Sequence, residues 1–552
     1  MIEIEIDKLP AGELAELCES QRKLIASLME ENRNLSASVE DCMQQIARLN
    51  EMIACKNKNL FGRKSETAST LQLYLDFETS EVKNPEAKAA EAGEGEEAPV
   101  KKKRKKKSGK FAGIQEEVTI DHDDKTELEK KYGAGNIVET GTQVIDQLVY
   151  VPGRFIMQHH LVHLCEVKNE STPSGDPLVV PAEKPEVLLE GSVLTPSLFA
   201  FIFTERFFKG CPWYRLESLF KRNGIPVGRQ IMCFWFIKVM ETYLSALVEF
   251  MKDDLGKCEI RHGDETTWKC IEDKSHEKNY IWVQCSGASE EKQIVVFSYS
   301  DGRDSEFAME LYEGHGGYLG CDHYVGYEKL GMKRQLCFDH ARRRAAKAVE
   351  CDPAHAEYKR LKTKEERSGF LATHEAYALK AELLSKIDRI YMLERKFKDM
   401  SPQERKTARD KESRPALDEL KEFLDNASGI FVKEGYMGEA VNYLLNGWDL
   451  FCTFLEDGRI EITNGRAERM IKNVVIGRKN SLFSSSRNGA GCTADAYTIM
   501  ETCKANGLKP YDYIEYVLEQ MASMKGATKE KLRELLPYSK SLPERLYAKK
   551  KG

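Results

Sequence analysis

Three acidic residues in the second half of the chain stand where a carboxylate could do chemistry. Asp264 lies in GDET on a strand-like run, Asp322 follows a second run in YLGCDHY, and Glu468 lies in ITNGRAERMIKNVVIGRKN among basic residues. Carboxylates brought side by side repel one another unless a divalent cation separates them. Mg²⁺ suits such a site because a few carboxylates and the phosphate oxygens of a substrate can hold it. Two such ions can activate an attacking oxygen and stabilise a leaving one, so the pattern predicts phosphoryl chemistry with two Mg²⁺ ions, for which Mn²⁺ can substitute.

Each of these residues also has an ordinary structural interpretation. Glu468 could form an i,i+4 ion pair with Lys472 on an exposed helix face. Asp264 could end a strand and Asp322 could lie in a turn. Glu265, next to Asp264, is expected to point to the opposite face of the strand and to stay out of the site.

The surroundings of Glu468 favour a polyanion. Asn464 is a plausible N-cap that places Glu468 in the first helical turn, where the helix dipole favours a carboxylate and phosphate binding. The basic residues predicted to hold the polyanion here are Arg466, Arg469, Lys472, Arg478 and Lys479. Cys337 and His340, in CFDH, could be half of a zinc site, but no second ligand pair is in view, so they are interpreted as supports around the site.

The elements around these residues predict an α/β fold. Three strand-like runs, a helix, a fourth strand and a second helix follow one another between residues 257 and 350, and the last of them begins at KRQLCFDH. The order β-β-β-α-β-α, with one carboxylate on the first strand and another after the fourth, is that of a ribonuclease-H-like domain. A long helical insertion is expected over residues 351–455, with AELLSKIDRIYMLERKFKDM and PALDELKEFLDNA as its clearest helices, before the glutamate helix in 456–500 and a helical segment in 501–552.

Residues 1–66 are predicted to contain a coiled coil. Cys18, Ile25, Asn32, Val39, Ile46 and Ile53 share one heptad position, and Leu14, Gln21, Leu28, Leu35, Cys42 and Leu49 share another. β-branched residues at a, leucines at d and one asparagine at a favour a parallel two-stranded coiled coil. The alternative is an amphipathic helix packed on its own chain. The predicted partner is therefore a second copy, and Gly62 is the expected end of the helix.

The next two regions differ in composition. Residues 67–110 are predicted to form an acidic and then basic linker. Its KKKRKKK block could be a nuclear address, an arm that binds phosphate with salt-sensitive affinity, or a solvated tether neutralised by the acidic tract. Residues 111–175 are predicted to form a small β-rich module. His159, His160, His163 and Cys165 invite a zinc interpretation, but no CxxC pair completes four ligands, so zinc binding is doubtful.

Residues 176–256 are predicted to be helical and to contain a helix-turn-helix, with a turn at Gly224 and a second helix that opens near Gly228. Arg229 and Gln230 would then face bases in the major groove. A purely structural hairpin is equally compatible with the pattern. Trp235 is expected in the core.

Composition points to a soluble protein inside the cell. The 552 residues carry a net charge of −6 and are 41% hydrophobic and 31% charged. Fifteen cysteines without a CxxC pair are typical of reduced thiols. No signal peptide is evident, and the apolar run GSVLTPSLFAFIFT is too short to span a bilayer.

The chain resembles the insertion-sequence 66 transposases, bacterial enzymes of the Asp-Asp-Glu class. The likeness runs from LFGRKSE almost to the end of the chain and is carried by the following motifs: GDET, GYLGCDHYVGY, CFDHARRR, YLLNGWDLFCTFLEDGRIEITNGRAERMIKNVVIGRKNSLF and ETCKANGLKPYDYIEYVL. The resemblance implies that Asp264, Asp322 and Glu468 are the catalytic triad. It also implies an N-terminal leucine zipper and a module that is usually a zinc finger.

Two departures from the family pattern stand out. The CxxC pair of the finger is replaced by DHDDKTELEKKYGAGN, and Asp-Asn-Asn before the glutamate is replaced by Thr463-Asn464-Gly465. The expected function is metal-dependent strand cleavage at element ends and strand transfer into target DNA, in the bacterial cytoplasm at the nucleoid. Accessory proteins of the same element are possible partners. The alternatives are an inactive, repurposed DNA-binding protein and a nuclease that does not join strands.

Overall fold

The computed structural model describes residues 11–61, 153, 155–156, 164–171, 177–181, 187–273, 278–314, 316–431, 435–524 and 528–548. Two compact units divide the chain: residues 1–82 with 196–542, and residues 83–195 with 543–552. The predicted linker and most of the predicted small β module lie outside the described residues, as do His159, His160, His163 and the side chain of Cys165.

A five-stranded sheet forms the centre of the larger unit, with the order β5-β4-β3-β6-β7. Its strands are β3 (Ile260–Trp268), β4 (Asn279–Ser286), β5 (Val295–Ser300), β6 (Tyr318–Cys321) and β7 (Lys333–Leu336). The first three are antiparallel neighbours, whereas β6 runs parallel to β3 and β7 runs parallel to β6. Seven of the eight residues of β4 are buried, so this strand is covered on both faces.

One strand differs from the sequence prediction. The run KRQL was interpreted as the start of a helix, but it forms β7, and the helix α9 (Phe338–Glu350) begins only after Cys337. Four residues are too few to show an alternating pattern. Pairing with β6, from Tyr318↔Lys333 to Cys321↔Leu336, provides the hydrogen bonds that make this segment a strand.

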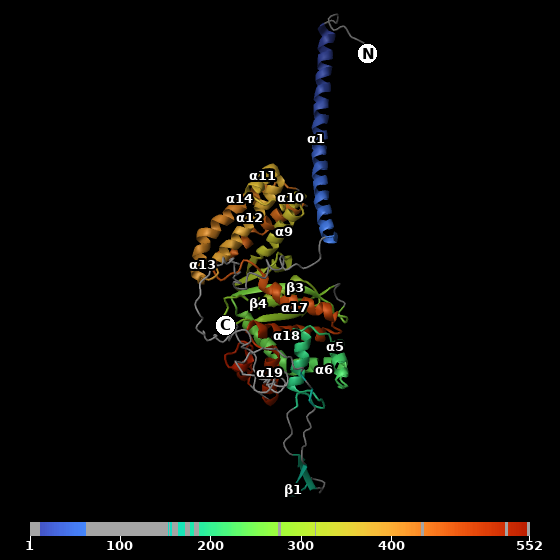
Figure 1. Cartoon of the computed structure of the whole chain (residues 1–552), viewed down its shortest axis with the longest axis vertical. Helices are drawn as coiled ribbons and strands as arrows, with labels where there is room; N and C mark the ends of the chain where they lie inside the picture. The colour runs from blue at the N-terminus through green and yellow to red at the C-terminus, as the bar shows by residue number, and fades with distance from the viewer. Residues whose placement is uncertain are drawn as a thin grey trace, which may run out of the picture. The chain divides into compact units, whose positions relative to one another are not determined.

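Helices pack against the sheet (Figure 1). The helix α17 (Gly465–Ser481) lies on β3 and β4, and α18 (Arg487–Ala505) lies on β5. Short elements connect the strands: α8 (Ser305–Tyr312) and η4 (Val325–Tyr327). Further helices pack against α18, namely η2 (Thr204–Phe208), α6 (Arg229–Val239), η3 (Met240–Leu244), α7 (Ser245–Gly256) and α19 (Pro510–Ser523). The remaining helices of this part of the unit are α4 (Pro196–Phe203), α5 (Trp213–Arg222) and α20 (Lys529–Arg533).

The predicted helical hairpin is present as α5 and α6. Gly224, with φ of +72°, lies in the turn between them, and Gly228 precedes the second helix. Trp235 is buried, as predicted. The helical segment from Arg229 to Gly256 is long and apolar enough to cross a membrane, but 44% of its most apolar window is buried inside the protein, as in a core helix.

The region between Asp322 and Glu468 contains the predicted helical insertion. After α9 its elements are α10 (His355–Tyr358), α11 (Lys364–Thr373), α12 (Glu375–Lys396), α13 (Pro402–Ala408), η5 (Arg409–Ser413), α14 (Arg414–Ala427), α15 (Tyr436–Asn446), α16 (Trp448–Phe451) and η6 (Thr453–Leu455). Capping boxes begin two of them, at Thr363 with Glu366 and at Ser401 with Glu404. The two segments predicted as the clearest helices correspond to α12 and α14.

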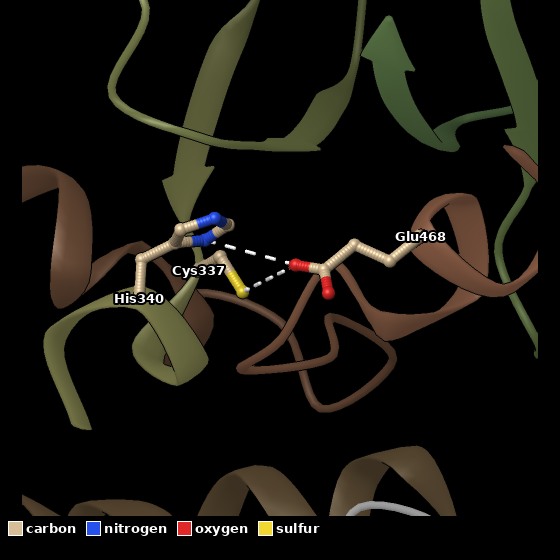
Figure 2. A group of neighbouring side chains, drawn as sticks. All are labelled: Cys337, His340 and Glu468. Carbon is tan, nitrogen blue, oxygen red and sulfur yellow. Dashed lines mark hydrogen bonds and ion pairs between the residues drawn. The ribbon is translucent and has the colours of Figure 1, made fainter. Parts of the chain in front are cut away.

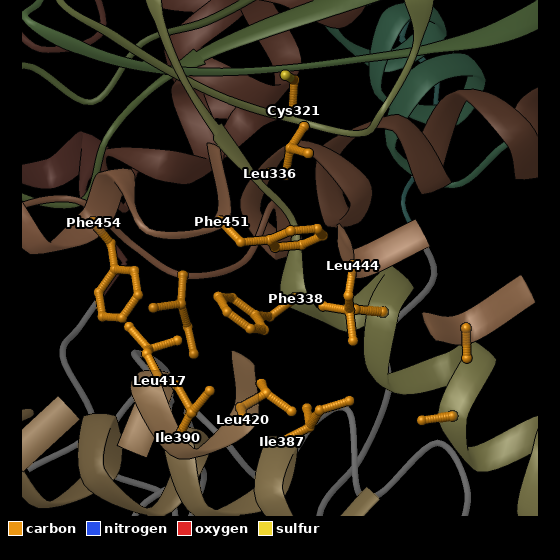
Figure 3. Close-up of a cluster of buried hydrophobic side chains, with 14 of the residues drawn as sticks. Cys321, Leu336, Phe338, Ile387, Ile390, Leu417, Leu420, Leu444, Phe451 and Phe454 are labelled. Atoms are coloured by element: carbon orange, nitrogen blue, oxygen red, sulfur yellow. The ribbon is translucent and has the colours of Figure 1, made fainter. Parts of the chain in front are cut away.

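A continuous apolar core joins this insertion to the sheet (Figure 3). Leu336, at the end of β7, and Phe338, at the start of α9, belong to the same buried cluster as Ile387 of α12 and Leu420 of α14. The insertion is therefore packed on the part of the sheet formed by β6 and β7, and Asp322 directly follows β6.

A buried guanidinium ties the insertion to the segment that leads to Glu468. Arg409 is fully buried and donates to the carbonyl oxygens of Phe454 (2.8 Å), Asp457 (2.9 Å) and Ile460 (2.9 Å). Its remaining hydrogen bonds go to the Glu394 carboxylate at 2.9 and 2.6 Å. Five donors with five acceptors make this a fully used arginine.

The N-terminal helix α1 (Ala11–Phe61) is one continuous helix of 51 residues that ends directly before Gly62. Large apolar side chains at the predicted heptad positions are exposed along it, namely Ile25, Leu28, Leu35, Val39 and Ile46. In the smaller unit β1 (Leu164–Ser171) and β2 (Pro177–Pro181) form an antiparallel pair. The range 176–256, predicted as helical, thus begins with a strand, and its first helix starts at Pro196.

Candidate active site

Strand pairing brings the two predicted aspartates together. β3 and β6 are parallel and in register at His262↔Gly320. The same register two residues further on places Asp264 beside Asp322, which directly follows β6. Gly320 permits this close approach, because a Cβ there would lie 2.4 Å from Nδ1 of His262.

Negative charge gathers on this part of the sheet. Nη2 of Arg343 lies 3.9 Å from Oε2 of Glu468, and Arg303 interacts with Asp322. Asp264, in contrast, forms no ion pair among the described residues. Burial raises the pKa of Asp264 well above its usual value, and the charges of Glu265, Asp322 and Glu468 raise it further. Oδ1 of Asp264 accepts a hydrogen bond from the Glu265 backbone N–H at 2.9 Å. Oδ1 of Asp322 is buried and has no hydrogen-bond partner among the described residues. An acceptor left in this state suits a cation.

Glu468 enters the site from α17 (Figure 2). Its Oε1 lies 3.7 Å from Nδ1 of His340 and 3.9 Å from Sγ of Cys337, and its Oε2 lies 3.9 Å from Nη2 of Arg343. The nitrogen contacts are longer than hydrogen bonds. In the described part of the chain Glu468 forms no ion pair with Lys472, so the simple helix-surface interpretation is wrong.

Asn464 occupies the predicted N-cap position, but its side chain does not cap α17. Its Nδ2 donates to the Gly263 carbonyl oxygen at 2.7 Å, and its Oδ1 lies 3.3 Å from Nδ1 of His262. Its backbone N–H donates to Sγ of Cys337 at 3.1 Å. The prediction of a capping side chain is therefore wrong, because Asn464 is used instead to join β3, α9 and α17.

A buried histidine–glutamate pair behind Asp264 was missed by the sequence analysis. Nε2 of His262 lies 2.9 Å from Oε2 of Glu461, and the His262 side chain is 1% exposed. Burial opposes ionisation of Glu461, but the hydrogen bond and charge of His262 lower its pKa to about 2. His262 shares a strand face with Asp264, two residues apart, and that alternation was the available signal. Nothing in the sequence pointed to Glu461.

Glu265 points to the opposite face, as predicted. Its side chain is 2% exposed, and its carboxylate accepts hydrogen bonds from Arg303 and, at 2.8 Å, from the Tyr327 hydroxyl. Arg303 and Tyr327 are partners that the sequence did not suggest.

The five basic residues around Glu468 divide into two groups. Arg466 donates to the Ser286 carbonyl oxygen at 3.0 Å and also to the Gln293 side chain. Arg478 donates to Oγ1 of Thr266 at 3.1 Å and to Thr267. Both arginines thus hold α17 on the sheet. Arg469, Lys472 and Lys479 are exposed on α17.

The predicted groove residues Arg229 and Gln230 open α6. The backbone N–H of Arg229 donates to Oε1 of Glu217 on α5 at 3.1 Å, and the Gln230 side chain is exposed. The first turn of α6 is therefore accessible.

The carboxylates fit a hard divalent cation in donor type and charge, and the unpaired Oδ1 of Asp322 supports that fit. They do not form a closed cage. Among the described residues the group of ligand atoms that lie within 4.8 Å of one another consists of Cys337, His340 and Glu468.

Comparison with known proteins identifies the family of this chain. Residues 191–491, which include all three carboxylates, match the model described as Transposase IS66 family. The chain belongs to the IS66 transposase family. Residues 498–538 of this IS66 transposase match the IS66 C-terminal element, and residues 48–112 match the model described as Transposase C of IS166 homeodomain.

Two relatives come from Sinorhizobium fredii (strain NBRC 101917 / NGR234). The IS66 transposase is 24% identical over 419 residues to uncharacterized protein y4hP, covering 74% of this chain and 72% of that protein. It is 26% identical over 369 residues to uncharacterized protein y4qI, covering 65% of each chain. The family resemblance seen in the sequence is thus confirmed.

Proposed function

We propose that this IS66 transposase cuts DNA strands at the ends of an insertion sequence and joins the freed ends to target DNA. Asp264, Asp322 and Glu468 are the catalytic residues in this proposal. The observation that carries it is the group of carboxylates formed by Asp264, in the middle of β3, Asp322, directly after β6, and Glu468 on α17, together with the buried Oδ1 of Asp322 that makes no hydrogen bond among the described residues. In the strand order β5-β4-β3-β6-β7, the first three strands are antiparallel neighbours, and β6 and β7 extend the sheet parallel to β3. This order supports a ribonuclease-H-like fold.

The three carboxylates would hold two Mg²⁺ ions, or Mn²⁺ in their place, and these would supply activation of the attacking oxygen and stabilisation of the leaving oxygen. The protein's own groups position the reactants. Asn464 fixes the start of α17 against β3, and the His262–Glu461 pair supports the strand behind Asp264. The amino end of α17 favours a phosphate nearby.

Two reactions would share the site. Water breaks a phosphodiester at the element end and leaves a 3′-hydroxyl. That hydroxyl then attacks a target phosphodiester, forms a new bond to phosphorus and releases a target 3′-hydroxyl. Neither reaction needs a nucleophile from the protein, so positioning and charge neutralisation provide the rate enhancement.

DNA would be held by exposed basic residues. Arg469, Lys472 and Lys479 lie on α17 beside Glu468, and Arg229 and Gln230 lie on the accessible turn of α6. Arg466 and Arg478 hold α17 on the sheet, so we remove these two arginines from the residues proposed to contact DNA. The family membership supports DNA as the partner and the cytoplasm as the location.

Two copies would pair through α1. The apolar side chains exposed along that helix need a partner, and a parallel coiled coil buries them in one seam. Pairing matters because both ends of an element must be processed together. Accessory proteins of the same element are further proposed partners.

The deciding experiment is a strand-joining assay with labelled element-end DNA and a target plasmid, in Mg²⁺ or in EDTA, with wild type and Glu468→Gln. Joined products that require Mg²⁺ and vanish in the variant are expected. Cleavage without joining would identify a nuclease. Binding without cleavage, even with the element's other proteins added, would identify a repurposed DNA-binding protein.

A further inference from the structure

Glu468 also meets a second type of donor set, a thiol and an imidazole. Sγ of Cys337, Nδ1 of His340 and Oε1 of Glu468 all lie within 4.8 Å of one another. Figure 2 shows the cysteine and histidine side chains converging on the carboxylate from the start of α9. From the sequence, Cys337 and His340 could be half of a zinc site, but without a second pair they were interpreted as supports; Glu468 is the ligand that the sequence did not connect with them.

The Cys337 thiol donates a long hydrogen bond to Oε1 of Glu468 at 3.9 Å, but hydrogen bonding does not account for the position of His340. Nδ1 of His340 is buried and makes no hydrogen bond in the described part of the chain, although it faces Oε1 of Glu468 at 3.7 Å. The Cys337 side chain is buried, and its sulfur accepts the Asn464 backbone N–H at 3.1 Å. Burial and the charges of Asp339 and Glu468 raise the pKa of Cys337 well above its usual value, and the Asn464 donor offsets only part of that rise. A cation bound to the sulfur would stabilise the thiolate, the form in which cysteine binds a metal.

The spacing agrees with tetrahedral coordination. Zinc lies about 2.3 Å from sulfur and about 2.0–2.2 Å from nitrogen or oxygen, which sets neighbouring ligand atoms roughly 3.3–3.5 Å apart. The observed separations from Oε1 are 3.7 Å to nitrogen and 3.9 Å to sulfur, so shifts of a few tenths of an ångström bring these two pairs to ligand spacing, while the nitrogen and the sulfur lie within 4.8 Å of each other.

The positions of the ligands also suit an ion that enters from solvent. Cys337 precedes α9 and His340 lies one turn on, so both project from the same face of the helix start. The His340 and Glu468 side chains are 26% and 30% exposed. That side is open to a fourth ligand, which water can provide.

We propose that Cys337, His340 and Glu468 form a site for Zn²⁺ or another borderline-soft divalent cation. Thiolate and imidazole ligands select such ions over Mg²⁺, which prefers oxygen. On binding, the Cys337 thiol loses its proton to solvent and one sulfur–metal bond forms.

Such binding would also affect catalysis, because Oε1 of Glu468 is then held by the soft ion and withdrawn from Asp264 and Asp322. This consequence rests on the proposed function, whereas metal binding itself does not. Zinc would therefore act as an inhibitor that competes for one carboxylate.

Metal binding is tested on the metal-free full-length protein with Co²⁺ as the probe. A thiolate ligand gives Co²⁺ a sulfur-to-metal charge-transfer absorption, and a tetrahedral site gives intense visible bands. One Co²⁺ per chain with both features is expected, displaced by Zn²⁺. Cys337→Ser should remove the charge-transfer band, and His340→Ala should weaken Co²⁺ affinity at least about tenfold.

Cys165→Ser is the matched control, because it removes the cysteine of the other histidine-rich stretch and should leave the spectrum unchanged. A missing charge-transfer band, a band that survives Cys337→Ser, or a band lost in Cys165→Ser would each overturn the site. If Cys337→Ser fails to fold, as judged by circular dichroism, the partly exposed His340→Ala decides alone, and unchanged Co²⁺ affinity overturns the site.

The inhibition is measured separately as the ratio of strand joining with and without Zn²⁺, at saturating Mg²⁺, within each variant. Zn²⁺ should reduce the wild-type ratio at least about tenfold and leave the ratio of Cys337→Ser near one. Equal inhibition of both proteins would overturn the competition for Glu468. A protein that binds Co²⁺ through Cys337 but joins no strands would instead refute the proposed function alone.

Discussion

Asp264 and Glu265 are consecutive residues of β3, yet the two faces of this strand treat a carboxylate in opposite ways. Glu265 is held by Arg303 and Tyr327, which counter the rise in its pKa caused by burial and by Asp322. Asp264 forms no ion pair among the described residues, and the charges of three other carboxylates, Glu265 included, raise its pKa on top of burial. A paired buried acid serves the architecture, whereas an unpaired group of acids is left for a ligand to complete. Exposure alone would not separate them.

The largest expected difference is in catalysis. Asp264→Asn should lower strand cleavage and joining by at least about a thousandfold, about 4 kcal/mol of transition-state stabilisation, because the hard-cation ligand is lost. Glu265→Gln, corrected for its folded fraction, should retain activity within about tenfold. Rates measured with pre-folded protein at saturating Mg²⁺ test this. Equal losses in both variants would remove the functional distinction between the two faces.

Metal-dependent stability should differ next. Mg²⁺ at about a hundred times its dissociation constant should raise the free energy of unfolding of the wild-type protein by about 2.7 kcal/mol through mass action. Asp322→Asn should abolish most of that increase. Thermal unfolding over a Mg²⁺ series, with Na⁺ at matched ionic strength as the control, measures it. A full Mg²⁺ response in the variant would contradict the assignment of Asp322.

Stability without metal should show the reverse order. Glu265→Gln should cost about 2 kcal/mol, less than a fully buried ion pair because the Arg303 side chain is 37% exposed. Asp264→Asn should be neutral or stabilising, since it relieves repulsion among carboxylates. Urea unfolding in EDTA compares the two. A large loss of stability in Asp264→Asn would show that this carboxylate also serves the architecture.

The smallest effects concern the basic residues of α17. Lys472→Gln and Lys479→Gln should each reduce the salt dependence of DNA binding by about one unit of slope and change stability by less than about 0.5 kcal/mol. Arg478→Gln should instead cost about 1 kcal/mol of stability, because its hydrogen bonds to β3 are lost. Binding titrations at several salt concentrations, beside urea unfolding, distinguish the two groups.

The sequence located the carboxylates because their surroundings are strongly patterned. Alternation placed Asp264 on a strand, and the apolar run before Asp322 placed it after one. The 3.6-residue period of the insertion predicted α12 and α14 for the same reason. These signals are local, because each can be recognised within one short segment of the sequence.

What the sequence could not predict depends on contacts between distant segments. β7 is too short for a pattern and owes its conformation to β6. Charged Arg466 and Arg478 resemble surface residues until the acceptors on β4, β3 and the adjoining segments are known. Asn464 had the right position for a cap, but Gly263 and His262 compete successfully for its side chain.

The hydrogen bonds of Arg409 join the insertion to the segment that leads to Glu468, so they affect how the two ends of the insertion are held together. Roughly 150 residues separate the second aspartate from the glutamate, and bringing the ends of a flexible segment of that length together would cost about 4 kcal/mol in entropy. Because the insertion is folded, its own packing offsets this entropy when the protein folds, before the substrate binds. At Gly458 a Cβ would lie 1.8 Å from the Pro402 carbonyl oxygen, so the returning chain has little freedom to shift. A substitution that destabilises the insertion far from the carboxylates should therefore slow the reaction, because Glu468 would then occupy its catalytic position in a smaller fraction of the molecules.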